Sequence, residues 1–513
     1  MFRKVLVANR GEIAVRVIRA LHDLGVEAVA IFSEADRAAL HVRLADEAYC
    51  VGPASAAQSY LSTPAILEAA RRSGAEAIHP GYGFLSESAA FAQACIEAGV
   101  VFVGPAPATL ALMGDKVEAR KLAAQTGVPT VPGTFEPVLE DAEALAAAEQ
   151  IGFPLVIKAA AGGGGKGMRA VRTRDELRPR LEQARREAQA SFGDGRVYLE
   201  HLVEQPRHIE VQLFGDGRGR VVHLGERECS IQRRYQKVVE ETPAPNLPDG
   251  VRQRLWDAAV TAATAAGYAS AGTIEFLYEP PTGRFYFLEM NARLQVEHPV
   301  TELVSGVDLV QAQLLLAAGA TLEEALAGFS RTASPTSGVS PHRSGLHAIE
   351  ARISAEDPEE SWFPATGRIE LLREPAGPGI RVDSACEPGM VVEVYYDPLL
   401  AKLIAWGRSR EEAVARLRRA LDEYVLTGVR TTLPFHRWLV RDPAFLAGEL
   451  STTFVDERWR PRPTAEVGDA ARAAALAAAE LQARRRRAAA LQPAARAEDG
   501  SLWRRAGRLA ALH

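Results

Sequence analysis

The 513-residue chain is poor in cysteine and contains no long apolar run. No apolar stretch approaches the roughly 20 residues that a membrane span requires, and the first residues show no signal-peptide pattern. The few cysteines lie far apart without the spacing of a metal site, which indicates a reducing compartment; they are Cys50, Cys95, Cys229 and Cys386. We therefore expect a soluble, cytoplasmic protein with no membrane partner.

Positive charge is not in excess either. The formal net charge is −5 at pH 7, whereas nucleic-acid-binding chains are usually basic, so no nucleic-acid partner is expected. The apolar, charged, glycine and proline contents are those of ordinary globular proteins. A chain of this length is expected to fold as about three or four domains.

The first hundred residues alternate short apolar runs with helical stretches. We expect a helix over residues 13–24 and strands at residues 5–8, 28–32, 75–78 and 100–103. This alternation predicts an α/β domain with a doubly wound parallel sheet, over residues 1–114. Such sheets bind ligands beyond the carboxyl ends of their strands, where residues 9–12 and 79–84 would lie. A glycine-rich turn with core aromatics is an equally good interpretation of residues 79–84.

A run of glycines follows an expected strand farther along the chain. The prolines of residues 105–135 predict a linker around a helix that contains Asp115 and Lys116, and residues 136–204 predict a small α/β unit. In that unit an apolar strand over residues 154–158 leads into four consecutive glycines and Lys166. The glycines expose backbone N–H groups that can hold phosphate oxygens, and no Gly-Lys-Ser/Thr of a Walker loop follows. A flexible linker is the alternative, but the position inside a compact unit favours a lid that closes over nucleotide.

Residues 289–302, which read EMNARLQVEHPVTE, have the composition of a reaction centre. Glu289 and Asn291 leave an expected strand on the same face, and their carboxylate and amide oxygens suit Mg²⁺. Arg293 adds a cation that can hold an anion beside the metal, and Glu297 is a candidate base. The alternative is a strand end whose charges face water.

A predicted hairpin supports the metal interpretation. Residues 273–277 and 284–291 are expected to pair through a turn at residues 280–283. This pairing would bring Glu275 near Glu289, and two facing acids without a metal would repel each other.

A loop rich in Ser, Pro and Gly, residues 331–345, separates this region from a C-terminal domain over residues 346–459. There the pattern predicts strands at residues 347–353 and 402–406 and a helix over residues 411–425. Residues 460–513 are rich in Ala and Arg and predict a helical tail. A surface helix is expected there, and a helix that docks on a partner is the alternative.

Taken together, these segments resemble biotin carboxylases, the ATP-grasp components of biotin-dependent carboxylases. The resemblance covers residues 1–459 and rests on the order and spacing of ANRGEIA, HPGYGFLSE, MGDK, GGGGKGM, ERECSIQRRYQKVVEE, EMNARLQVEHPVTE, EARISAEDP and YYDPLLAKLIAWG. It is closest to the biotin carboxylase part of acyl-CoA carboxylase α-subunits. It implies an N-terminal parallel-sheet domain, an ATP-grasp domain over residues 115–330 with a mobile lid at 136–204, and an α+β C-terminal domain.

The resemblance also implies a role for each matching residue. ATP would be held by Lys116, Lys158, Gly163, Gly164, Gly165, Lys166, Gly167, Glu200, His201, Val203, His208 and Gln232. Mg²⁺ or Mn²⁺ would be held by Glu275, Glu289 and Asn291. Bicarbonate would lie against Lys237, Arg293, Gln295 and Val296, with Glu297 as its base. Tyr82 and Arg352 would face biotin, and Arg352 would stabilise the enolate-like anion of its ring.

The resemblance implies a C–N-bond-forming ligase that makes carboxyphosphate from ATP and bicarbonate and then carboxylates biotin. None of the seven lysines lies between two methionines as in the carrier motif, so biotin would arrive on a separate carrier protein or domain. The other partners that the resemblance implies are a second copy of the chain and a carboxyltransferase subunit.

Two alternatives make different demands on the sequence. Another ATP-grasp ligase, joining a carboxylate to an amine, would lack the Lys237, Arg293 and Glu297 seat, and a non-catalytic scaffold would have lost a metal ligand or the base. Neither loss occurs. The chain does depart from the family at Tyr235, usually histidine, and at His201, often lysine, so its ATP affinity is expected to differ. The hairpin between Glu275 and Glu289 looks long for the family, and residues 331–345 look like an insertion.

Overall fold

The computed structural model describes residues 1–159, 168–327, 345–461, 480 and 484. Residues 1–459 form one compact unit, and residues 460–513 form a second. The glycine loop with Gly163–Gly167 and nearly all of the expected insertion and helical tail lie outside the described residues. In the second unit, Arg484 Nε lies 3.0 Å from Glu480 Oε1.

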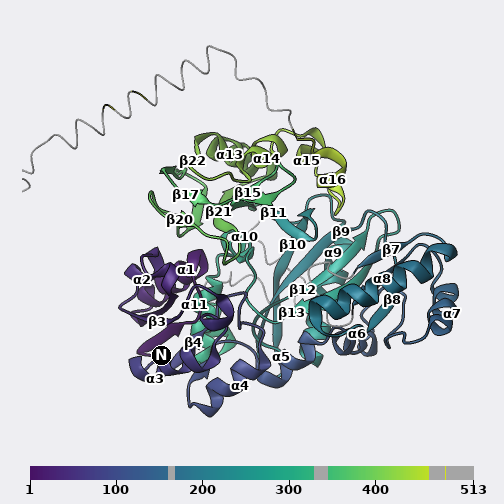
Figure 1. Cartoon of the computed structure of the whole chain (residues 1–513), viewed down its shortest axis with the longest axis horizontal. Coiled ribbons are helices and arrows are strands. Elements are labelled where there is room, and N and C mark those ends of the chain that lie inside the picture. Colours follow the sequence, from purple (N-terminus) through teal and green to yellow (C-terminus); the bar gives the residue numbers. More distant parts are fainter. Residues whose placement is uncertain (160–167, 328–344, 462–479, 481–483, 485–513) are drawn as a thin grey trace, which may run out of the picture. The chain divides into compact units, whose positions relative to one another are not determined.

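The N-terminal part contains the predicted parallel sheet (Figure 1), with strand order β3-β2-β1-β4-β5. The strands are β1 (Lys4–Val7), β2 (Glu27–Ser33), β3 (Glu47–Gly52), β4 (Ala77–His79) and β5 (Val101–Phe102). The sequence pattern missed β3, because this edge strand alternates with polar, partly exposed residues and has no apolar run. The helices are α1 (Gly11–Asp23), α2 (Leu40–Leu44), α3 (Thr63–Ser73) and α4 (Ala89–Glu97), with 3₁₀ turns at Glu34–Asp36 and Ala56–Gln58.

The helix expected around Asp115 and Lys116 is found as α6 (Lys116–Gln125), but the linker expected before it is wrong, because α5 (Pro107–Gly114) lies there. Asp115 separates the two helices and caps α6, accepting hydrogen bonds from the backbone N–H groups of Val117 and Glu118. Pro107 lies in the first turn of α5, where a proline costs no hydrogen bond. Proline therefore marks a helix start here, not a linker.

Residues 136–204 form the expected small α/β unit, a three-stranded antiparallel sheet ordered β7-β6-β8. Its elements are α7 (Asp141–Ile151), β6 (Leu155–Ala159), β7 (Arg169–Val171), α8 (Arg174–Phe192) and β8 (Val197–His201). Its buried side chains form a cluster of their own that includes Leu155, Ile157 and Leu181. A separate core allows the unit to move as one body.

One eight-stranded antiparallel sheet runs through the rest of the first unit, ordered β13-β12-β9-β10-β11-β14-β21-β19. The strands are β9 (Arg207–Asp216), β10 (Val221–Arg233), β11 (Gln236–Thr242), β12 (Ala269–Glu279), β13 (Arg284–Asn291), β14 (His347–Ser354), β19 (Ile380–Ser384) and β21 (Leu399–Gly407). Because β11 pairs with β14, the sheet continues from the expected ATP-grasp region into the expected C-terminal domain. Ile231, Val239, Ile349 and Leu403 accordingly share one apolar cluster.

Helices and short strands cover this sheet. The helices are α9 (Asp249–Ala265), α10 (His298–Ser305), α11 (Leu309–Ala317), α12 (Leu322–Ala325), α13 (Arg410–Glu423), α14 (Leu433–Leu439), α15 (Pro443–Ala447) and α16 (Phe454–Arg458). The remaining strands are β15 (Glu356–Asp357), β16 (Phe363–Pro364), β17 (Gly367–Arg368), β18 (Leu371–Arg373), β20 (Val391–Val392) and β22 (Val425–Thr427). Among the described residues no single helix is long and apolar enough to cross a membrane. Helices α10 and α11 reach that length and apolar content only when taken together, and the pair is bent by 91°.

Candidate functional site

The predicted hairpin is confirmed, and it places the candidate metal ligands opposite one another. Strands β12 and β13 pair with Glu275 facing Glu289 and Thr273 facing Asn291. Cross-strand partners project from the same face of a sheet, so the two carboxylates and the amide border the same space. Glu275 and Glu289 line two neighbouring cavities, and Asn291 lines the second.

Lys237 is the centre of the charged cluster. Its Nζ lies 2.5 Å from Glu210 Oε2, 2.7 Å from Glu275 Oε1 and 2.6 Å from Glu297 Oε1. Burial disfavours the ammonium, but the three carboxylates outweigh burial and raise the pKa of Lys237 well above its ordinary value. The lysine is therefore a permanent cation that brings three acids together.

Glu297 is held by two cations at once. Besides Lys237, Arg352 Nη2 donates to Glu297 Oε2 over 2.9 Å. Burial opposes ionisation of this carboxyl, yet Lys237 and Arg352 hold the pKa of Glu297 well below its ordinary range. Glu297 is thus ionised and can accept a proton. It precedes α10, whose first turn contains Pro299, so the carboxylate stands at a helix start with a stiff backbone.

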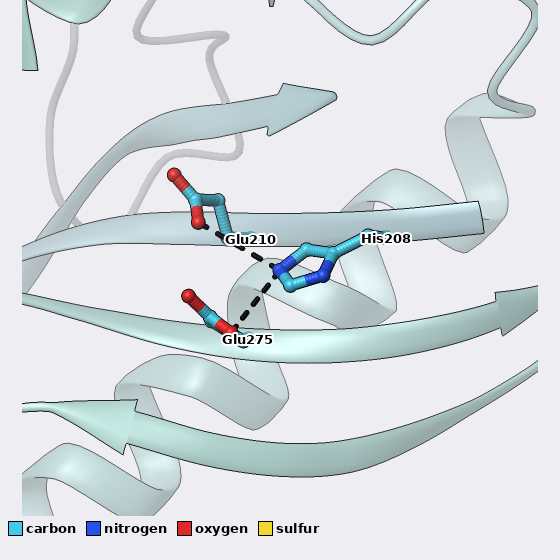
Figure 2. A group of neighbouring side chains, drawn as sticks. All are labelled: His208, Glu210 and Glu275. Atoms are coloured by element: carbon cyan, nitrogen blue, oxygen red, sulfur yellow. Dashed lines mark ion pairs between the residues drawn. The ribbon is translucent and has the colours of Figure 1, made fainter. Parts of the chain in front are cut away.

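Figure 2 shows His208 beside two of the carboxylates that contact Lys237, those of Glu210 and Glu275. His208 Nε2 lies 3.2 Å from Glu275 Oε2 and 3.9 Å from Glu210 Oε2. Burial lowers the pKa of His208, but Glu275 more than offsets burial, and the pKa is raised overall. His208 Nδ1 also lies 2.9 Å from Gln232 Nε2, which joins two of the expected nucleotide-binding residues.

Glu210 and the arginine that holds it were not predicted from the sequence. Arg227 is fully buried; its Nε donates to Glu210 Oε1 over 2.5 Å, and its Nη1 donates to Gln212 Oε1 over 2.6 Å and to Thr301 Oγ1 over 2.9 Å. The signal was present, because His208, Glu210 and Gln212 recur at every second position of an apolar strand. A buried central strand with polar groups on one face indicates a site.

The expected nucleotide-binding residues that are described share one cavity of about 910 Å³. A cavity of this size is in the range of small-molecule sites. It is lined by Lys116, Lys158, Glu200, His201, Val203, His208 and Gln232, together with Glu275 and Glu289. Lys116 Nζ lies 2.6 Å from Glu289 Oε2, and Lys158 pairs with Glu200. In this structure each lysine is therefore neutralised by an acid.

A second cavity, of about 850 Å³, contains the expected bicarbonate and biotin contacts. Its walls include Tyr82, Lys237, Asn291, Arg293, Gln295, Val296 and Arg352. His208, Glu275 and Glu289 also line the first cavity, so the two cavities adjoin at these side chains. A reacting group in one cavity can therefore meet a nucleotide phosphate in the other.

Arg293 is oriented by Glu87, a residue that the sequence analysis did not single out. Arg293 Nε donates to Glu87 Oε2 over 3.0 Å, and its Nη2 donates to Asn291 Oδ1 over 3.0 Å. Glu87 Oε1 also accepts the backbone N–H of Ala292. Glu87 follows the glycine-rich segment 79–84, so the N-terminal domain holds the arginine of the candidate site.

The donor set fits a hard divalent cation. Glu275 and Glu289 supply two facing carboxylates and Asn291 an amide oxygen, which are the ligands that Mg²⁺ prefers. Asn291 Nδ2 donates to Glu275 Oε1 over 3.0 Å, so the amide oxygen points away from that carboxylate and toward Arg293. The carboxylates fit the cation better than the amide does.

Arg352 and Tyr82, the two residues predicted to face biotin, both line the second cavity. Arg352 Nε donates to Glu240 Oε1 over 2.6 Å. Burial disfavours the guanidinium charge, but Glu240 and Glu297 raise the pKa of Arg352 above its ordinary value. The Tyr82 hydroxyl is buried and has no hydrogen-bond partner among the described residues.

Tyr235 is at the tip of the β10–β11 hairpin, and its backbone is unusual. Arg234 and Tyr235 have φ of 50° and 65°, the left-handed conformation that Asn-Gly usually supplies in such turns. The Tyr235 side chain is 59% exposed, and both residues line the two cavities. Tyr235, one of the two positions expected to depart from the family, therefore lies where the two cavities meet.

Three family models match successive parts of the chain. They are biotin carboxylase, N-terminal domain, over residues 1–110; carbamoyl-phosphate synthase L chain, ATP binding domain, over residues 115–325; and biotin carboxylase C-terminal domain over residues 350–457. Biotin carboxylase 1 of Bacillus subtilis is 47% identical over 458 residues, covering 89% of this chain and 98% of the relative. Biotin carboxylase of Nostoc sp. is 49% identical over 461 residues, covering 89% and 99%.

Solved structures show the same likeness. A biotin carboxylase–β-γ-ATP complex from Campylobacter jejuni has a TM-score of 0.83 at 41% identity and covers 89% of this chain and 99% of that one. The biotin carboxylase domain dimer of Hydrogenobacter thermophilus 2-oxoglutarate carboxylase, in complex with MgADP, ADP and bicarbonate, has a TM-score of 0.83 at 46% identity and covers 89% and 98%. The biotin carboxylase subunit of pyruvate carboxylase has a TM-score of 0.73 at 46% identity and covers 89% and 98%.

Proposed function

This chain belongs to the biotin carboxylase family, and we propose that the buried cluster around Lys237 carries its chemistry. The enzyme is an ATP-dependent ligase that carboxylates biotin with bicarbonate. The observation that supports these residue roles best is the position of Glu297, which is buried and bound by both Lys237 and Arg352, two cations that line the second cavity.

In the proposal, ATP occupies the first cavity. Lys116 and Lys158, now paired with acids, turn to the phosphates, while Glu200, His201, Val203, His208 and Gln232 surround the rest of the nucleotide. The proposed glycine loop, with Gly163–Gly167, lies outside the described residues and keeps its predicted role. Glu275, Glu289 and Asn291 would hold Mg²⁺ or Mn²⁺, which neutralises phosphate charge when it is bound.

Bicarbonate is proposed to lie in the second cavity between Lys237 and Arg293, against Gln295 and Val296. Bicarbonate is a weak nucleophile, so Glu297 removes its proton while its oxygen attacks the γ-phosphorus of ATP. The O–P bond of carboxyphosphate forms as the bond to ADP breaks. Lys237 and Lys158 stabilise the negative charge that spreads over the phosphoryl oxygens.

Biotin is proposed to enter the same cavity from the side of Tyr82 and Arg352. Carboxyphosphate releases CO₂ beside biotin, and the phosphate that leaves takes the ring proton. The guanidinium of Arg352 then stabilises the enolate-like anion, which attacks CO₂. Tyr82 contributes an aromatic wall to this cavity.

We further propose that the chain works with a biotinylated carrier, a second copy of itself and a carboxyltransferase subunit. Two comparisons support these partners. One similar structure is described as the biotin carboxylase subunit of pyruvate carboxylase, and the Hydrogenobacter domain is described as a dimer.

The proposed function is tested by ATP hydrolysis in degassed buffer with Mg²⁺ or Mn²⁺. Addition of bicarbonate should start slow hydrolysis, and free biotin should accelerate it, because biotin removes carboxyphosphate productively. Equal rates with and without bicarbonate would contradict the proposal.

A further inference from the structure

Lys402 is a buried lysine that the proposed mechanism does not use. It lies on β21, where its neighbours across the sheet are Arg352 on β14 and Asp383 on β19. Its side chain is 0% exposed. A buried ammonium needs several partners to compensate for its lost hydration, so the partners of Lys402 indicate its role.

The ammonium makes three polar contacts, with one main-chain carbonyl and two carboxylates, and it also lies 5.6 Å from the centre of the Tyr82 ring. Lys402 Nζ donates to the Val296 carbonyl over 3.0 Å and lies 3.3 Å from Glu12 Oε2 and 3.8 Å from Asp383 Oδ2. Asp383 already receives two hydrogen bonds from Arg381. Neither oxygen of Glu12 accepts a hydrogen bond from a described residue. The hydrogen bond to Val296 is therefore the best formed of the three contacts.

Val296 belongs to a turn whose carbonyl groups are held one after another. His298 Nδ1 lies 2.8 Å from the Gln295 carbonyl. Burial and nearby cations, Lys402 first among them, keep the pKa of His298 well below its ordinary value, so the neutral ring donates through Nδ1. The next carbonyl, that of Val296, accepts from Lys402. The residue after Val296 is the proposed base, Glu297.

The contact joins segments that are far apart in the chain. Glu12 lies on α1, Val296 follows β13, and Lys402 lies on β21. Helices α1 and α10 both pack against β21 (Figure 1). One buried ammonium thus connects the N-terminal helix, the turn before α10 and the C-terminal strand.

We propose that Lys402 is a positioning residue for bicarbonate, which fixes the turn at residues 295–297 through the Val296 carbonyl. The inference rests on the proposed function, in which Gln295 and Val296 contact bicarbonate and Glu297 takes its proton. A displacement of about 1 Å at a reacting group can lower a rate roughly 10²-fold. Within the described part of the chain, no hydrogen bond or ion pair joins Lys402 to a proposed nucleotide-binding residue. The effect should therefore fall on bicarbonate and spare ATP.

The test compares Lys402→Met with Arg410→Met. Methionine fills a similar volume to lysine but has neither a charge nor a donor. Arg410 is a matched control because it is another largely buried cation, and its partners Glu241, Phe445 and Leu446 lie outside the turn. Two readouts are compared in the full chain: amide hydrogen exchange of residues 295–298 without ligand, and the KM values for bicarbonate and ATP.

Lys402→Met should speed exchange in the turn by roughly tenfold or more. It should raise the bicarbonate KM about 10- to 100-fold and change the ATP KM less than about threefold. Arg410→Met should leave both KM values and exchange in the turn near normal, although it too removes a buried charge. A purely structural role of Lys402 predicts that the two variants behave alike.

If Lys402→Met alone does not fold, the double variant Glu12→Gln/Lys402→Met is tested in its place. The second substitution removes the buried Glu12 carboxylate that would otherwise have lost its cation. The inference predicts a folded protein whose bicarbonate KM is still raised. Unchanged exchange in the turn, whatever the bicarbonate KM, would overturn this inference alone. Faster exchange with an unchanged bicarbonate KM would overturn the inference together with the roles assigned to Gln295 and Val296.

Discussion

At the scale of single residues, the site is built from acids that neutralise cations. Lys237 is bound by three carboxylates, Lys116 by Glu289, and Arg293 by Glu87. A bound bicarbonate and a nucleotide would compete for these cations. When these ligands bind, each acid is therefore suited to one of two roles: it moves away from its cation, or it accepts a proton. Substitutions of the acids should distinguish the two roles.

Glu289→Gln and Glu297→Gln both remove one negative charge, but we expect different outcomes. Glu289→Gln should raise the metal concentration that the enzyme needs and weaken ATP binding, since an amide is a poorer ligand for Mg²⁺. Glu297→Gln should leave metal and ATP affinity nearly intact while the bicarbonate-dependent rate falls by roughly 10²- to 10⁴-fold. Calorimetric titrations and steady-state kinetics on both variants distinguish these results.

If Glu297→Gln lost ATP binding as badly as Glu289→Gln, or kept near-normal turnover, its role as the base would be wrong. An account based only on net charge predicts the same phenotype for both variants. Each variant therefore serves as the control for the charge change in the other.

Glu241 is the residue whose charge should make stability depend on pH. Burial opposes its ionisation, but Arg410 and His347 lower the pKa of Glu241 to about 2. Because the folded pKa is below the ordinary value, its contribution is complete above about pH 4.5 and is lost as the pH falls toward about 2. That contribution is roughly 3 kcal/mol.

Glu241→Gln should therefore lower the free energy of unfolding near pH 7 and matter less in acid. The difference from the unaltered chain should be about 1 kcal/mol smaller near pH 3.5 than near pH 7. Urea unfolding of both proteins at the two pH values measures this. A difference that is constant with pH would show that the ionised carboxylate is not the source of the effect.

At the scale of elements, the unit of α7, β6, β7, α8 and β8 is the part most suited to movement. It has its own apolar cluster, while Lys158 and Glu200, on β6 and β8, belong to the cavity proposed for ATP. Closure would bring the unit toward the large sheet as the phosphates replace Glu200 at Lys158. Lid movement is a prediction that follows from this arrangement.

A pair of labels can measure the closure. Gln183→Cys on α8 and Thr261→Cys on α9 place labels on exposed side chains, and Cys50→Ser removes the exposed native thiol. Addition of an ATP analogue with metal should shorten the distance between the two spin labels, as measured by double electron–electron resonance. An unchanged distance would refute closure, and a label pair on α9 and α13 serves as the control.

At the scale of the whole molecule, the chain is expected to carry no biotin of its own. Its seven lysines include Lys237 and Lys402, which are buried in ion pairs, and none stands between two methionines. The expressed protein should therefore give no signal with avidin after denaturing electrophoresis. A biotinylated carrier on the same blot is the positive control, and a band from this chain would contradict the expectation.

The sequence alone determined a large part of this protein. Glu275 and Glu289 could be paired in advance, because two short strands joined by a Pro-Pro-Thr-Gly turn allow few registers. Local patterns also predicted the parallel sheet and the small unit at residues 136–204, since period and turn chemistry are local properties. The edge strand β3 and helix α5 were missed, because exposed edges and proline at helix starts weaken those same signals.

Which charged side chains lie in contact with one another was decided only by the tertiary structure. No local pattern assigned a role to Glu210, Glu87, Arg227 or Lys402, because each of them contacts a residue between 15 and 206 positions away. It also decided that one sheet crosses from the ATP-grasp region into the C-terminal domain through the pairing of β11 with β14. The physical reason is that buried charges are stabilised by partners in space, and strand pairing over long distances leaves no local trace in the sequence.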